Sequence, residues 1–192
     1  MNGTTTLLII LSFLCAAGYY WTCLRLVSVQ STVDGRIYKV RPKQTRQESA
    51  DTLARVSRRV VVFLDTLKNT VPTTHHYYSH LDLMCRKLHA GKPMISEVPQ
   101  GIPGTSFTSN KECIYLCLKA KRRWGQEGAL HNDELLVHVL LHECAHVGNP
   151  TIGHDTSFYE FWRWLEEKSH QYKLYDHEVV AQSDCYCGMS LV

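Results

Sequence analysis

The feature that most constrains this chain is a short motif of two histidines and a glutamate in a segment with the signals of a capped helix. Residues 142–146 read His-Glu-Cys-Ala-His. In an α-helix, residues four apart differ by about 40° in rotation and about 6 Å in rise, so His142 and His146 project from one face. Asn132 is a good N-cap and Gly148 is a common helix stop. The pattern predicts a helix that holds two imidazoles side by side.

Two imidazoles in this arrangement can share a metal ion, which leaves Glu143 to act as a general base on water. The chain contains 11 histidines in 192 residues, yet its composition predicts only roughly 0.03 accidental matches to this motif. Catalytic zinc takes three protein ligands, so a third ligand is required. His154, which follows Gly153 and a short loop, is the preferred candidate. Asp155 is the alternative.

Elsewhere, the periodicity of apolar residues predicts further helices and a hairpin. Apolar residues recur at helical spacing over residues 47–68, and a shorter helix is expected over residues 79–89. Residues 106–119 contain two β-type runs around a polar turn, which predicts a hairpin. A capping box at Ser157 and Glu160 opens another helix. The predicted fold class is therefore α+β, with the motif helix packed on a small antiparallel sheet.

Residues 7–24 form an apolar run without a charged side chain. As a helix this run would be about 27 Å long, close to the hydrocarbon thickness of a bilayer. Basic residues follow it, so the charge bias predicts a single-pass membrane protein with its N-terminus outside and its main domain in the cytosol. The alternative is a cleaved signal peptide, with Cys15-Ala16-Ala17 as the cleavage site and a secreted domain.

Charge is distributed unevenly along the chain. The formal net charge is +3, and residues 36–46 contain five basic residues and no acid. Without those five charges the rest of the chain is close to neutral, so a nucleic-acid partner is possible but not favoured. The expected organisation is a transmembrane anchor over 1–26, a basic juxtamembrane segment over 27–46 and a folded domain over 47–192. A second basic cluster, at residues 119–123, is expected to be a solvated loop.

Other histidines and cysteines are expected to have structural roles. His138 lies one turn before His142, where a structural histidine is more common than a ligand. Cys185-x-Cys187 has no second pair at a suitable spacing, so structural thiols are favoured over half a zinc site. Cys113 and Cys117 would share one face of a strand, as core residues or with one in a disulfide. Residues expected at the surface or in core packing are His75, His76, His80, Phe158 and Trp162.

The segment HECAHVGNPTIGHDTSFYEFW resembles the active-site segment of the WLM and SprT-like zinc metallopeptidases. These families place an HExxH helix before a loop, a further histidine and a helix with an early inward-facing aromatic residue. Together with IYKVR, ESADTLARV, SFTSNKECIYLCLK and CYCG, the segment is similar to compact WLM-type proteins of large DNA viruses. The resemblance covers most of residues 33–192. It implies a zincin-like metallopeptidase domain in which His142, His146 and His154 bind Zn²⁺ and Glu143 is the general base.

The expected function is a membrane-anchored zinc endopeptidase that hydrolyses peptide bonds in a protein or peptide by metal-activated water. The predicted strand over residues 113–118 is expected to hold the substrate backbone by strand addition. One alternative is a non-catalytic, membrane-tethered zinc module, whose fourth ligand would be Asp155 or His138. Another is a DNA-associated protease that acts on DNA–protein crosslinks. The latter is less favoured because the chain is expected to be membrane-anchored. CYCG is also too short for the C-terminal zinc ribbon that SprT-like relatives often have.

Overall fold

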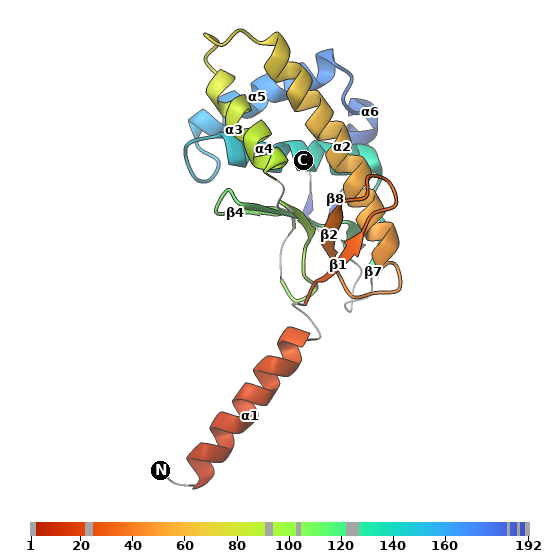
Figure 1. The fold of residues 1–192 in the computed structure, drawn as a ribbon, viewed down its shortest axis with the longest axis vertical. Coiled ribbons are helices and arrows are strands. Elements are labelled where there is room, and N and C mark those ends of the chain that lie inside the picture. The colour runs from red at the N-terminus through yellow and green to blue at the C-terminus, as the bar shows by residue number, and fades with distance from the viewer. Residues whose placement is uncertain are drawn as a thin grey trace.

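The computed structural model describes residues 3–21, 25–90, 94–102, 105–121, 127–183, 185–187 and 189–190. Within these ranges the chain is α+β. A group of helices lies on one side of a mixed β-sheet, and the N-terminal helix extends away from both (Figure 1).

The main sheet has five strands in the order β1-β2-β3-β5-β4. The outer pairs, β1 with β2 and β4 with β5, are antiparallel, whereas β2–β3 and β3–β5 are parallel. The prediction of an antiparallel sheet was therefore wrong. Two helices separate β2 from β3 along the chain, so the chain re-enters the sheet in the same direction. The strands are β1 (Val27–Gln30), β2 (Ile37–Val40), β3 (Ile95–Glu97), β4 (Phe107–Ser109) and β5 (Cys113–Leu116).

The helices predicted from periodicity are present, with ends that differ by one or two residues. Two short two-stranded sheets complete the described elements. The helices are α2 (Arg46–Thr70), α3 (Tyr78–His89), α4 (Asp133–Gly148), α5 (Thr156–Gln171) and α6 (His177–Ala181). The short sheets pair β6 (Lys119–Lys121) with β7 (Glu127–Leu130), and β8 (Cys185–Tyr186) with β9 (Met189–Ser190).

Helix α4 lies at the centre of the domain. It contacts four other helices (α2, α3, α5 and α6) and the two strands β4 and β5. Leu136 and Leu140 of α4 are fully buried. At the C-terminal end of α4, a Cβ atom on Gly148 would lie 2.9 Å from Met84 Cγ, so only glycine permits this close approach to α3. The motif helix is thus held by the core on several sides.

The prediction of a transmembrane helix is wrong. The N-terminal helix α1 spans Gly3–Tyr19 and has 17 residues, the first four of which are glycine and threonines. Its apolar part, residues 7–19, is about 20 Å long, shorter than the bilayer core of about 30 Å. No helix within the described ranges is both long and apolar enough to cross a membrane. The predicted single-pass topology, with an anchor over 1–26 and a cytosolic domain, is therefore not supported; residues 22–24 of the predicted span lie outside the description.

Residues 27–46, predicted to be a basic juxtamembrane segment, contribute the first two strands of the sheet. Tyr38 and Val40 of β2 are buried, whereas Ile37 and Lys39 are exposed. Arg41, one of the five basic residues, is also buried. Its backbone N–H donates to Glu97 Oε2 at 2.9 Å and its Nε donates to the Val98 carbonyl at 2.7 Å. This basic run is therefore partly structural.

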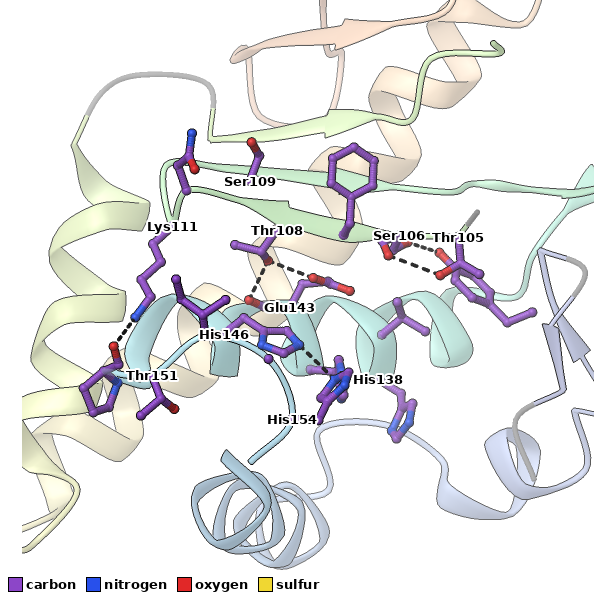
Figure 2. A pocket seen from close by; sticks show the side chains of 18 residues that line it. Thr105, Ser106, Thr108, Ser109, Lys111, His138, Glu143, His146, Thr151 and His154 are labelled. Atoms are coloured by element: carbon purple, nitrogen blue, oxygen red, sulfur yellow. Dashed lines mark hydrogen bonds between the residues drawn. The ribbon is translucent and has the colours of Figure 1, made fainter. Parts of the chain in front are cut away.

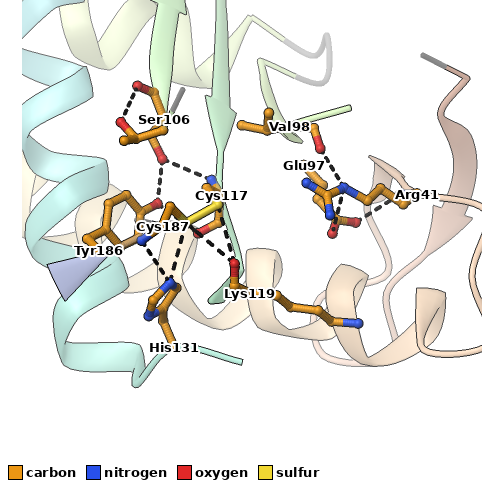
Figure 3. The surroundings of a disulfide bond; sticks show 10 residues. Arg41, Glu97, Val98, Ser106, Cys117, Lys119, His131, Tyr186 and Cys187 are labelled. Atoms are coloured by element: carbon orange, nitrogen blue, oxygen red, sulfur yellow. Dashed lines mark hydrogen bonds and ion pairs between the residues drawn. A yellow bond between two sulfur atoms is a disulfide. The ribbon is translucent and has the colours of Figure 1, made fainter. Parts of the chain in front are cut away.

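A disulfide joins Cys117 to Cys187 and fastens the C-terminal segment to the sheet (Figure 3). The Tyr186 hydroxyl donates to the Cys117 carbonyl at 2.8 Å and lies 2.5 Å from Ser106 Oγ. The Cys117 backbone N–H donates in turn to Ser106 Oγ at 2.9 Å. Cys187 therefore has a structural role, as expected, but as a disulfide partner rather than a thiol; a disulfide was among the alternatives for Cys117.

Candidate metal centre

Helix α4 places the motif histidines as the sequence predicts. Asn132 is the N-cap, and its side chain accepts a hydrogen bond from the Glu134 backbone N–H at 2.8 Å. His142 and His146 lie one turn apart and their ring centroids are 5.0 Å apart. The helix is buried on most sides, so these two rings have a fixed base.

His154 approaches the same point from the loop after α4. Gly153 has φ +85, a conformation that favours glycine, and turns the chain back toward the helix. His154 Nε2 lies 3.1 Å from Nε2 of His142 and 3.1 Å from Nε2 of His146 (Figure 2). The potential ligand atoms of the three residues all lie within 4.8 Å of one another. The structure therefore brings the three predicted ligands together.

The chemistry of these donors fits a zinc ion. Tetrahedral zinc with bonds of about 2.05 Å to nitrogen requires ligand nitrogens about 3.3 Å apart, close to the separations from His154. Metal ligation also needs neutral imidazoles. Burial, together with the neighbouring histidines, lowers the pKa of His142 to about 3. Burial and His154 lower the pKa of His146 to about 4, so both rings are neutral near pH 7.

Helix α5 contributes an aromatic side chain, Phe158, that packs against the histidine rings. Phe158 is fully buried and stacks on His146, with ring centroids 4.2 Å apart. Its ring centroid also lies 5.1 Å from that of His142 and 4.8 Å from that of His154. The expectation that Phe158 belongs to the core is confirmed, but this side chain also contacts all three histidines. A packed aromatic side chain of this kind limits the rotation of the rings.

Glu143 points from α4 toward β4 rather than into the helical core. The residue is only 5% exposed, and burial raises its pKa to about 7. Thr108 Oγ1 lies 2.8 Å from Glu143 Oε2 and 3.0 Å from the Glu143 carbonyl oxygen, and this hydrogen bond to the side chain lowers the pKa against the effect of burial. A carboxyl group with a pKa near 7 can both accept and release a proton at neutral pH.

The histidines and Glu143 line one cavity of about 1030 Å³. Its walls are residues 105–111, which include β4, one face of α4, the loop at residues 150–154, and Tyr186 (Figure 2). Strand β4 is the edge of the sheet, whereas β5 pairs on both sides. The expectation that residues 113–118 hold a substrate strand was therefore wrong, because the free edge beside the cavity belongs to β4.

The alternative ligands have other partners. The Asp155 side chain caps α5 and accepts from the Phe158 backbone N–H at 2.9 Å, so the helix begins earlier than the predicted capping box. His138 Nδ1 lies 2.9 Å from Tyr175 Oη, which agrees with the predicted structural role. Among the described residues, His142, His146 and His154 form the one group of three or more potential metal-binding side chains.

Sequence reasoning missed two polar contacts to this site. Thr108 and Lys111 lie more than 30 residues from the α4 motif, and the Lys111 side chain bonds to the loop before His154. No local pattern marks such long-range contacts. The order of the motif, with an aromatic residue soon after His154, was the available signal for the contact that Phe158 makes.

Comparisons with known proteins place this chain near two viral sequences. No family model matches it, and no solved structure matches it. It is 26% identical over 163 residues to "Uncharacterized protein R325" of Acanthamoeba polyphaga mimivirus, and the matched region covers 84% of this chain and 80% of that protein. It is 35% identical over 71 residues to "Uncharacterized protein 136R" of Invertebrate iridescent virus 6, which covers 37% of this chain and 39% of that protein. The viral origin of both relatives is compatible with the prediction of a viral protein.

Proposed function

We propose that this chain is a zinc-dependent endopeptidase of the WLM/SprT-like type. The observation that carries the proposal is the convergence of three histidine Nε2 atoms, from His142, His146 and His154, in the cavity that Glu143 also lines. Three histidine nitrogen donors with a nearby carboxyl group are a usual set of a hydrolytic zinc site.

In the proposed reaction, different residues of the site have different roles in peptide hydrolysis. When bound, zinc supplies a Lewis acid that lowers the pKa of water and polarises the carbonyl of the peptide bond. The Glu143 carboxylate would accept the proton of the attacking water and later deliver it to the leaving amine. Thr108 holds the Glu143 carboxyl group at 2.8 Å, and Phe158 restrains the three rings.

The proposed substrate is an extended segment of a protein or peptide that lies along β4. This strand forms the edge of the sheet and borders the cavity, so its outer backbone groups can pair with another strand. Pairing of this kind recognises backbone rather than sequence, which suits a protease acting on unfolded chains.

Two rival functions have less support. A purely structural zinc module needs a fourth protein ligand, but Asp155 caps α5 and His138 bonds to Tyr175. A DNA-associated protease would use the two basic runs, but part of each is engaged in the fold. Arg41 of the first run is buried, and Lys119 of the second run bonds to Thr45. Residues 122–123 of the second run lie outside the described ranges.

The test is cleavage of an unfolded protein by the purified chain before and after metal removal. We expect a chelator to abolish cleavage and stoichiometric zinc to restore it. His154→Ala should lose cleavage, whereas the matched control His138→Gln, on α4 one turn before His142 but outside the ligand group, should keep it. Cleavage that survives both chelation and His154→Ala would contradict the proposal. Zinc binding without any cleavage would favour the structural module.

A further inference from the structure

The turn between β4 and β5 reaches across to the loop that carries His154. Lys111, in this turn, donates from Nζ to the carbonyl oxygen of Pro150 at 2.9 Å (Figure 2). It also donates to the carbonyl oxygen of Asn149. Both carbonyls belong to residues 149–154, the loop that connects the second histidine to the third. A single side chain thus links the sheet to the metal-site loop.

We propose that Lys111 is a positioning residue that holds His154 at the metal site through these two hydrogen bonds. The inference rests on the proposed function insofar as His154 binds zinc, but the link between the turn and the loop is made by the chain's own residues and can be measured separately. The hydrogen bonds of the Lys111 side chain go to the loop carbonyls, not to the three histidines or Glu143, so its role is positioning rather than catalytic.

The loop needs such a restraint because burial contributes little to its order. Ile152 is 92% exposed, and His154 is also exposed. An exposed apolar side chain does not stabilise the loop, so hydrogen bonds must add to the ring contact between His154 and Phe158. A lysine ammonium group forms stronger hydrogen bonds to carbonyls than a neutral donor does.

The first residue of the loop, Asn149, is held by burial and hydrogen bonds, and Lys111 restrains the residue that follows it. Asn149 is fully buried, and its backbone N–H donates to the Ala145 carbonyl at 2.8 Å. The Ser157 hydroxyl donates to Asn149 Oδ1 at 3.1 Å, which ties the loop to α5. Lys111 then restrains the next residue, Pro150, on the side that faces the cavity.

The backbone conformation of the turn allows the effect of the Lys111 hydrogen bonds to be separated from the effect of backbone strain. Lys111 has φ +56 and Asn110 has φ +50, a left-handed conformation that glycine adopts more easily than lysine. Lysine is therefore the less favourable residue for the turn itself, and its two hydrogen bonds offset that cost. Lys111→Gly relaxes the backbone and removes the link, whereas Lys111→Met removes the link alone.

The experiment measures zinc affinity by competition with a chromogenic chelator, and amide hydrogen exchange of residues 151–154 in protein from which metal has been removed. The variants are Lys111→Met, Lys111→Gly and the conservative Lys111→Arg. The matched control is Lys87→Met, because Lys87 lies in α3 and its side chain pairs with Glu112 of the same turn rather than with the loop. We expect Lys111→Met and Lys111→Gly to bind zinc at least about tenfold more weakly.

The same two variants should show faster exchange in the loop, while Lys111→Arg should retain most of the wild-type behaviour and Lys87→Met all of it. Unchanged zinc affinity and unchanged exchange in Lys111→Gly would overturn the inference. If the wild-type protein binds no zinc, the proposed function fails, and the exchange data alone decide: faster exchange supports the link and unchanged exchange refutes it.

Discussion

The disulfide between Cys117 and Cys187 should be a major source of stability. It closes a loop with a sequence separation of 70 residues, which includes the metal-site helix α4. In the chain-entropy description, a cross-link of this span lowers the entropy of the unfolded chain by an amount worth about 4 kcal/mol at 25 °C. A domain of this size is typically stable by about 5–15 kcal/mol, so the loss would be a large fraction of the total.

The perturbation is Cys187→Ala, measured by urea unfolding followed by far-ultraviolet circular dichroism. We expect the free energy of unfolding to fall by about 4 kcal/mol, and reduction of the wild-type protein to give a similar loss. The matched control is Cys113→Ala in β5, four residues before Cys117, because Cys113 is a free thiol. It should change stability by about 1 kcal/mol or less.

Peptide mapping without reduction checks the covalent assignment. It should recover the peptide that contains Cys117 linked to the peptide that contains Cys187. A Cys187→Ala variant as stable as the wild type, or a wild-type protein whose unfolding is insensitive to reductant, would refute the reasoning. Either result would mean that the C-terminal segment is held by Tyr186 and its hydrogen bonds alone.

Two further predictions concern the surroundings of the metal site. Phe158→Ala should lower the free energy of unfolding by about 3–5 kcal/mol, because it empties a fully buried position, and it should weaken zinc binding in a chelator competition; an unchanged zinc affinity would show that the rings do not need this support. Burial lowers the pKa of His138 from 6.5 to about 4. Between these pH values the unfolded chain binds a proton that the folded chain does not, so stability is lost as the pH falls, by up to about 3 kcal/mol. Urea unfolding of metal-free protein at pH 7 and pH 4 should show that His138→Gln loses less stability than the wild type; equal losses would contradict this assignment.

The local features of the site could be predicted from the sequence because they depend on short spacings. His142 and His146 are four residues apart in a helix whose N-cap, Asn132, is also encoded locally. His154 was predictable because a glycine precedes it and a helix follows, which limits where the loop can lead. These relations involve a few neighbouring residues, so periodicity and capping rules describe them well.

The rest of the fold depends on contacts between distant segments. The parallel pairs β2–β3 and β3–β5 join strands whose sequences show no signal for one another. The bond from Thr108 to Glu143 and the disulfide at Cys187 are likewise long-range. Strand β2 alternates buried and exposed residues, but it is only four residues long and lies in a basic run, so its period-two pattern is a weak signal in the sequence.

The N-terminal run shows the limit of counting apolar residues. Eighteen residues without a charge suggested a membrane span, but a span also requires one continuous helix over that length. The helix in the structure begins in a polar stretch and ends at Tyr19, which leaves a shorter apolar part. Helix boundaries, rather than composition, decided this point.

The most direct test of the proposed zinc peptidase combines zinc content with cleavage in Glu143→Gln. Glutamine has nearly the same shape as glutamate but cannot take up the proton, and Glu143 is not in the ligand group. We predict one zinc ion per chain in both the wild type and the variant, with cleavage of an unfolded protein by the wild type alone. Cleavage by Glu143→Gln at the wild-type rate, or a wild-type chain that binds no zinc, would contradict the account.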